Sequence, residues 1–458
     1  MPEIFEKQTM KYGLKWNFLD DTEIECKTYR RRWFILALFC LCSGGSAMQW
    51  IQYSIITNII VEYYHVSSVA VDWTSIIYMV VYIPLVFPAS YILQKKGLRV
   101  AVILGAFLLT AGSWIKVFSA EPNRFGITFA GQTVVGISQM FTLGVPARLA
   151  AVWFPHHQVS TATAIGVFGN QVGMAIGFLI PPMIVHESSD MNQISSELYA
   201  FYIGTAILTT IIFLLIIIFF ETSPPLPPSM AQKLTLIKDN RVEEKSFYFS
   251  LTHLIGNYNF VLLLFSYGMN IGAFYAYSTL LNQLITDHFS TGVEDAGRVG
   301  LTLIVGGMLG SLAWGIVLDK TQIYKGTTVL IYILATLGMT AFAYSLEKEI
   351  MTFIYITSGF LGFFMNGYLT VGYEFGAELT YPESEATSSG LLNASGELCG
   401  VMSVIVAEII LKQYGSLITD ISLVIMLLLG LILCVFIDGS KLKRLAASQR
   451  SNTNNMLL

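Results

Sequence analysis

Long apolar runs separated by short polar segments repeat along the whole chain. Many reach the roughly 18–20 residues that a helix needs to cross a bilayer, and the short alternating segments typical of a membrane β-barrel do not occur. The pattern predicts an all-α membrane protein. Its twelve expected spans cover residues 33–61, 70–94, 98–119, 125–152, 160–184, 198–220, 256–284, 297–318, 327–345, 350–378, 386–410 and 416–438.

A polar stretch divides these spans into two sets of six. The expected domains are an N-terminal segment (1–32), a six-helix half (33–220), a linker (221–255), a second six-helix half (256–438) and a C-terminal tail (439–458). This layout resembles a major-facilitator transporter, in which two pseudo-symmetric halves are related by an axis along the membrane normal. We therefore expect the major facilitator fold.

Composition supports the membrane assignment. Hydrophobic residues make up 54% of the chain and charged residues 12%, against roughly 45–50% and ~25% in soluble domains. There is no basic surface that would indicate a nucleic-acid partner. The expected surroundings are the lipid bilayer, most simply the plasma membrane, and the expected oligomeric state is a monomer.

The distribution of Lys and Arg predicts the orientation, because cytoplasmic loops carry an excess of these residues. With both termini in the cytoplasm, the inner segments hold 21 of the 26 basic residues. The five expected on the outer side are Lys116, Arg124, Arg298, Lys348 and Lys412.

Candidate site residues lie near the centres of four spans that are paired by the pseudo-symmetry. Transporter sites lie near the bilayer midplane between the repeats, where polar side chains are costly and usually functional. Spans one and seven carry aromatic residues there, and spans five and eleven carry an amide or a carboxyl group flanked by glycines. The predicted substrate-binding residues are Trp50 and Gln52 in span one, Gln171 in span five, Tyr275 in span seven, and Asn393 and Glu397 in span eleven.

This set suits an organic cation. A quaternary ammonium group cannot donate a hydrogen bond and is held by aromatic faces, with Trp the best. Gln171 could bond a hydroxyl group of the same ligand, and Glu397 could supply the countercharge. Packing remains an alternative for the aromatic residues, and interhelical hydrogen bonding for Gln171. Glu397 could instead be a neutral proton site or a hydrogen-bond donor.

Three further charged residues lie toward the inner ends of spans four and ten, which form a symmetry pair. Arg148 belongs to span four, and Glu374 and Glu378 belong to span ten. We interpret them as gating or structural charges.

The sequence offers little support for an enzyme, a cofactor or a metal site. It contains no Walker loop, nucleophile triad or cluster of metal ligands. The six histidines fall in loops or at span ends. No histidine is therefore placed to serve as an axial haem ligand within the membrane.

Several motifs resemble the feline leukemia virus subgroup C receptor-related (FLVCR) family, a branch of the major facilitator superfamily whose members are described as choline and ethanolamine transporters and as haem exporters. The resemblance covers nearly the whole transmembrane core. The stretches that carry it are QWIQYSI (49–55), YIPL (82–85), ARLAAVWF (147–154), VSTATAIGVFGNQVG (159–173), GFLIPP (177–182), GAFYAYSTLLN (272–282), DAGRVGLT (295–302), GFFMNGY (362–368), ELTYPESE (378–385) and SSGLLN (388–393).

The resemblance implies a choline site in which a span-one Trp and a span-seven Tyr cage the ammonium group. These positions match Trp50 and Tyr275, and a family glutamine of span five matches Gln171. The family glutamine of span eleven falls on Glu397, which is a departure. The resemblance thus implies alternating-access transport of choline and possibly ethanolamine. The alternatives are haem export and, from a different class, a receptor or sensor that does not transport.

Overall fold

The computed structural model describes residues 27–155, 158–228, 253–289, 292–380 and 385–439. In that part of the chain, twelve helices are long and apolar enough to cross a membrane. The predicted all-helical architecture with twelve spans is therefore confirmed. The middle of the predicted linker (229–252) and most of both predicted tails lie outside the described residues.

The N-terminal half contains six spans, two of which are divided into shorter helices. Its elements are α2 (Arg31–Ile51), η1 (Ser54–Ile56), α3 (Thr57–Tyr64), α4 (Ser68–Lys95), α5 (Leu98–Val117), α6 (Phe125–Leu143), α7 (Val145–Trp153), α8 (Val159–Ile184) and α9 (Met191–Phe219). Span one comprises α2, η1 and α3, and span four comprises α6 and α7.

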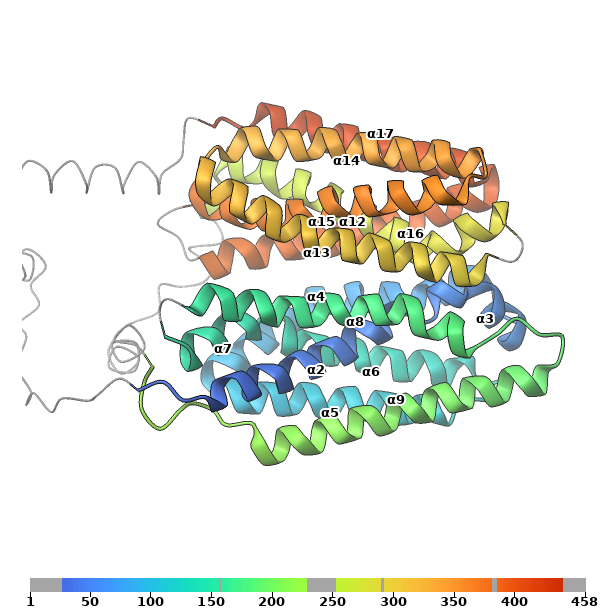
Figure 1. Cartoon of the computed structure of the whole chain (residues 1–458), viewed down its shortest axis with the longest axis horizontal. Helices are drawn as coiled ribbons and strands as arrows, with labels where there is room; N and C mark the ends of the chain where they lie inside the picture. The colour runs from blue at the N-terminus through green and yellow to red at the C-terminus, as the bar shows by residue number, and fades with distance from the viewer. Residues whose placement is uncertain (1–26, 156–157, 229–252, 290–291, 381–384, 440–458) are drawn as a thin grey trace, which may run out of the picture.

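The C-terminal half contains six uninterrupted helices. They are α12 (Tyr258–His288), α13 (Val293–Thr321), α14 (Tyr324–Glu347), α15 (Met351–Thr380), α16 (Glu385–Tyr414) and α17 (Ser416–Phe436). Figure 1 shows the two halves as two layers of helices lying side by side. Across the boundary, α4 packs against α16 and α8 against α13, while η1 and α3 touch α12.

The two ends of the bundle are named here after the predicted orientation. The outer end is the one where α3 meets α4, at residues 65–67, and the inner end is the one where α4 meets α5, at residues 96–97.

Hydropathy alone did not predict the breaks in spans one and four. The break in span four follows from Pro146, which lies in the first turn of α7 just after Gly144. A proline has no N–H to continue the helix and crowds the preceding turn. Helix α9 also begins earlier than the predicted span, because Asp190 caps a polar first turn by accepting a hydrogen bond of 2.9 Å from the Asn192 N–H.

The outward faces of the peripheral helices are apolar. On α9, the exposed residues Ile207, Ile211, Leu214 and Ile218 repeat at helical spacing. Such a stripe would be unusual on a soluble protein. It fits a helix that faces lipid on one side and the bundle on the other.

Candidate functional site

The break in span one lies directly after Trp50. Helix α2 ends at Ile51, and the backbone leaves the helical region at Ile56, with φ −123° and ψ 34°. Carbonyl groups freed by such a break must be paired inside a membrane, where water is absent. Their donors are side chains from other helices. Gln132 Nε2 donates to the Gln49 carbonyl over 2.6 Å, and Ser75 Oγ donates to the Trp50 carbonyl over 2.9 Å.

A third donor comes from the opposite half. The Asn282 amide, on α12, donates a 2.8 Å hydrogen bond to the carbonyl of Ile55. The broken segment is thus held by tertiary contacts and is tied to both halves. Discontinuous helices of this kind typically form substrate sites in transporters.

Trp50 meets Tyr275 across the boundary between the halves. Their ring centroids are 5.4 Å apart and the ring planes cross at 62°, an edge-to-face arrangement. Trp50 is only 5% exposed. Two of the predicted site residues, from spans one and seven, therefore form one aromatic pair.

Glu397 joins this pair through Tyr275. The Tyr275 hydroxyl donates a 3.0 Å hydrogen bond to Glu397 Oε1. Gly400, one turn further along α16, makes room for the same ring, because a Cβ atom at this position would lie 2.5 Å from Tyr275 Cδ2. The glycine-flanked carboxyl of span eleven and the aromatic residue of span seven thus pack as a unit.

Gln171 lies on α8, where this helix crosses α2 very closely. A Cβ atom at Gly173 would lie 2.1 Å from the Gly44 carbonyl oxygen, so the crossing requires glycine. Within the described part of the chain, the buried Oε1 of Gln171 has no hydrogen-bond partner. An unpaired buried amide oxygen is costly, so this atom is available to a ligand.

Asn393 lies one turn before Glu397 on α16, and residues four apart share a helix face. Its Oδ1 accepts a 2.5 Å hydrogen bond from the hydroxyl of Tyr373 on α15. The ring of Tyr373 in turn lies 5.7 Å from that of Tyr267. Neither tyrosine was predicted as a site residue from the sequence. Tyr373 is adjacent to Glu374, which was predicted as a gating or structural charge.

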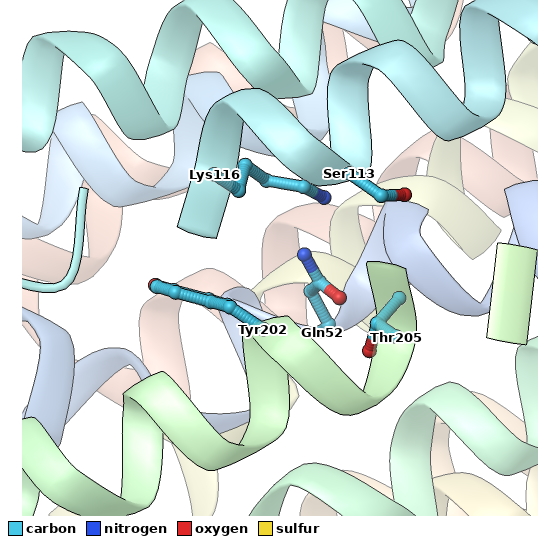
Figure 2. Close-up of a pocket in the computed structure, with 5 residues that line it drawn as sticks. All are labelled: Gln52, Ser113, Lys116, Tyr202 and Thr205. Carbon is cyan, nitrogen blue, oxygen red and sulfur yellow. The ribbon is translucent and has the colours of Figure 1, made fainter. Parts of the chain in front are cut away.

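Gln52 lies in a different place from the aromatic pair. Figure 2 shows it inside the N-terminal half, between Ser113 and Lys116 of α5 and Tyr202 and Thr205 of α9. Both polar atoms of its amide are buried without a hydrogen-bond partner in the described residues. The structure therefore does not bring Gln52 together with Trp50, Tyr275 and Glu397.

Lys116 is buried against Gln49, the residue before Trp50, although it was expected on the outer side. Only 2% of the residue is exposed. Its Nζ donates to Gln49 Oε1 and, over 3.1 Å, to Gln132 Oε1. Gln132 also pairs the Gln49 carbonyl at the helix break, so Lys116 stabilises the segment that carries Trp50.

The three predicted gating or structural charges differ in their burial. Arg148 is half-buried on α7, and Glu374 is exposed on α15. Glu378 is buried inside the C-terminal half, where the Tyr324 hydroxyl donates to it over 3.4 Å.

Comparisons with known proteins place this arrangement in a family. A model of the Major Facilitator Superfamily matches residues 34–404. The choline/ethanolamine transporter flvcr2a of Danio rerio is 47% identical over 428 residues, which cover 93% of this chain and 90% of that protein. The choline/ethanolamine transporter FLVCR2 of Homo sapiens is 41% identical, covering 94% and 81%. FLVCR1 of Felis catus is 43% identical, covering 89% and 73%.

The chain belongs to the FLVCR family of the Major Facilitator Superfamily. It is therefore an integral multi-pass membrane protein and a transporter by family, not an enzyme. Both the predicted family and the predicted fold class are confirmed.

Solved structures agree with the major facilitator fold. A bacterial homologue of the human lysosomal transporter Spinster, in an inward-facing conformation, aligns with a TM-score of 0.70 at 12% identity, covering 91% of this FLVCR chain and 98% of that protein. The transporter FucP, in an outward conformation, aligns with a TM-score of 0.62 at 15% identity, covering 89% and 100%.

Proposed function

We propose that this FLVCR-family protein transports choline and ethanolamine by alternating access around a site between its two halves. The observation that carries the proposal is the contact of Trp50 with Tyr275, whose hydroxyl is bonded to Glu397. In this proposal the two rings cage the ammonium group, Gln171 bonds the substrate hydroxyl, and Glu397 supplies the countercharge.

The physical basis is the attraction of a cation to aromatic faces. A desolvated cation gains about 2 kcal/mol from a well-placed ring. A ring pair with a carboxylate behind it therefore favours a compact monovalent cation over neutral or anionic molecules. Choline would use the ring faces, whereas the primary ammonium of ethanolamine could also donate hydrogen bonds to Glu397. Because Glu397 stands where the family has glutamine, we expect ethanolamine to compete more strongly with choline as a substrate.

The position of the rings supports the transport mechanism. Trp50 belongs to the N-terminal half and Tyr275 to the C-terminal half, so a rocking motion of the halves changes the distance between them. In this structure the halves are joined near the outer end, where Gln283 Nε2 of α12 donates to Asp72 of α4 over 3.1 Å. Opening of this end would separate the two rings and admit the substrate.

The topology and setting follow the charge distribution. We propose that both termini lie in the cytoplasm, that the protein acts as a monomer and that it resides in the plasma membrane. The first of these is tested by antibody access to tags at each terminus in intact and permeabilised cells.

The proposed function is tested by competition in a single expression system. Cells that express the protein take up labelled choline in the presence of unlabelled choline, ethanolamine or haem. We expect choline and ethanolamine to compete and haem to have no effect. Uptake that equals that of cells without the protein, together with expression-dependent haem efflux, would replace the proposal by haem export. Exchange of labelled choline in proteoliposomes separates a transporter from a receptor.

A further inference from the structure

Two carboxyl groups face each other across the boundary between the halves at the outer end. Asp72 lies near the start of α4, in the N-terminal half, and Glu408 lies near the end of α16, in the C-terminal half. Asp72 is 0% exposed and Glu408 is 2% exposed. Ser68, one turn before Asp72 on α4, donates a hydrogen bond to Glu408, so the two carboxyl groups lie close together across the boundary.

The donors around this pair leave one oxygen unsatisfied. Gln283 Nε2 donates to both oxygens of Asp72, each over 3.1 Å. On Glu408, Oε1 accepts a 2.8 Å hydrogen bond from Ser68 and lies 3.3 Å from Lys412 Nζ. The other oxygen, Oε2, is buried without a hydrogen-bond partner in the described residues.

A single proton accounts for this geometry. Two neighbouring buried carboxylates do not both stay ionised, because their repulsion is not screened by water. One proton bound to Asp72 can be donated toward Glu408 Oε2 and so satisfies the orphaned oxygen. It also leaves one negative charge, which Lys412 balances.

The other titratable groups at this end do not act on the pair through direct contacts. The charged groups that act on Asp72 are Glu408 and Lys412, both on α16, while α12 presents the neutral Gln283. Among the described residues, Glu62 of α3 and His65, which follows that helix, form no hydrogen bond or ion pair with Asp72 or Glu408. His288 of α12 contacts Ser416, Glu347 and Glu349 instead.

We propose that Asp72 and Glu408 form a proton-binding site that holds the outer end closed. The two carboxyl groups belong to different halves, so opening of the outer end separates them and exposes them to water. Separated and hydrated carboxyl groups release their proton at neutral pH. The closed state therefore holds one proton more than the open state.

The direction of the pH effect follows from this difference in bound protons. A state that binds more protons is favoured by acid, so raising the pH shifts the equilibrium toward the open outer end. The proton returns to the outer solution and does not cross the membrane. The site is thus a control of conformation that does not depend on which substrate the central site takes.

The experiment measures the distance between the halves at the outer end by pulsed electron spin resonance. Nitroxides are attached to cysteines placed at Asn123, exposed in the N-terminal half, and at Tyr414, 67% exposed in the C-terminal half. The full chain, with its native cysteines replaced by alanine, is studied in lipid nanodiscs without substrate. We expect two populations, one with a longer and one with a shorter distance between the nitroxides. The ratio of the longer-distance to the shorter-distance population should rise between pH 5 and pH 8, by up to about tenfold per pH unit for one proton.

Matched variants test whether the change of distance with pH arises from Asp72 and Glu408. In Glu408→Gln the amide donates to Asp72 without a proton, so we expect the short distance at every pH. Asp72→Asn should likewise abolish the change of distance with pH, and this variant replaces Glu408→Gln in the test if Glu408→Gln does not fold. Glu121→Gln, at an exposed carboxylate paired with Arg124 over 2.9 Å, should respond as the parent chain does. A parent chain with equal distances at pH 5 and pH 8, or a Glu408→Gln variant that responds like its parent, would overturn the proposal.

Discussion

Trp50 and Tyr275 meet edge to face across the boundary between the two halves, with ring centroids 5.4 Å apart. Each ring has its own support. Trp50 lies in the last turn of α2, whose freed carbonyls are paired by side chains of the bundle, and Tyr275 is bonded to Glu397. A site built in this way is rigid within each half and adjustable between the halves, as alternating access requires.

The hydroxyl of Tyr275 can be removed while its ring is kept. Tyr275→Phe should retain the aromatic face but leave Glu397 without its donor, a loss of about 1–3 kcal/mol for a buried hydrogen bond. We expect the apparent affinity for choline to fall by roughly tenfold, and by more in Tyr275→Ala. Concentration series of labelled choline uptake check this order. Tyr344→Phe, at a tyrosine that is 65% exposed, should match the wild type.

Glu397 is expected to act as a carboxylate. Acid would then reduce uptake, because protonation removes the countercharge, and Glu397→Gln should flatten this dependence on pH. The measurement is initial uptake of choline between pH 5.5 and pH 8 in the wild type and the variant. Parallel profiles in the two proteins would leave Glu397 with a static or structural role.

Lys116 should act on the site through the segment that carries Trp50. Lys116→Met keeps the apolar stem but leaves the Oε1 atoms of Gln49 and Gln132 without this donor. We expect lower thermal stability and a choline affinity weaker by roughly tenfold, since a misplaced ring forfeits part of its cation–π energy. Lys348→Met, at an exposed lysine of the outer end, is the control. Unchanged affinity in Lys116→Met would show that the buried lysine serves stability alone.

The crossing of α2 and α8 should not tolerate even a methyl group. In Gly173→Ala the new Cβ atom would lie 2.1 Å from the Gly44 carbonyl oxygen, so the two helices must separate. At Gly204, a Cβ atom meets nothing within 4 Å, and alanine should stabilise α9 by roughly 0.5–1 kcal/mol. Thermal unfolding followed by fluorescence in detergent should therefore shift in opposite directions. A Gly173→Ala variant as stable as the wild type would contradict the requirement for glycine at this crossing.

The sequence predicted those features of the fold that depend on hydropathy. Twelve apolar runs indicated twelve helices, because the bilayer imposes a minimum length on each span. The breaks in spans one and four were not predicted. Span one contains neither proline nor glycine at its break, and the donors that stabilise it, Gln132, Ser75 and Asn282, come from distant helices.

Part of the candidate site could be predicted because the two halves are related by symmetry. Pairing spans one with seven and five with eleven pointed to Trp50, Tyr275 and Glu397, which the structure connects. Gln52 was grouped with them by its closeness in sequence, but a helix turns residues two apart to different sides. Lys116, Asp72 and Glu408 were missed because each is close to a span end, where a charge is ordinarily assigned to a loop.

The aromatic cage is tested most directly by the concentration dependence of choline uptake in wild type, Trp50→Ala and Tyr275→Ala, at matched surface expression. Trp114→Ala, at a tryptophan that is 38% exposed on α5, is the control. Loss of about 2 kcal/mol per ring predicts apparent affinities weaker by about 30-fold in each site variant, with the control unchanged. Equal affinities in the wild type and both site variants would contradict the cage.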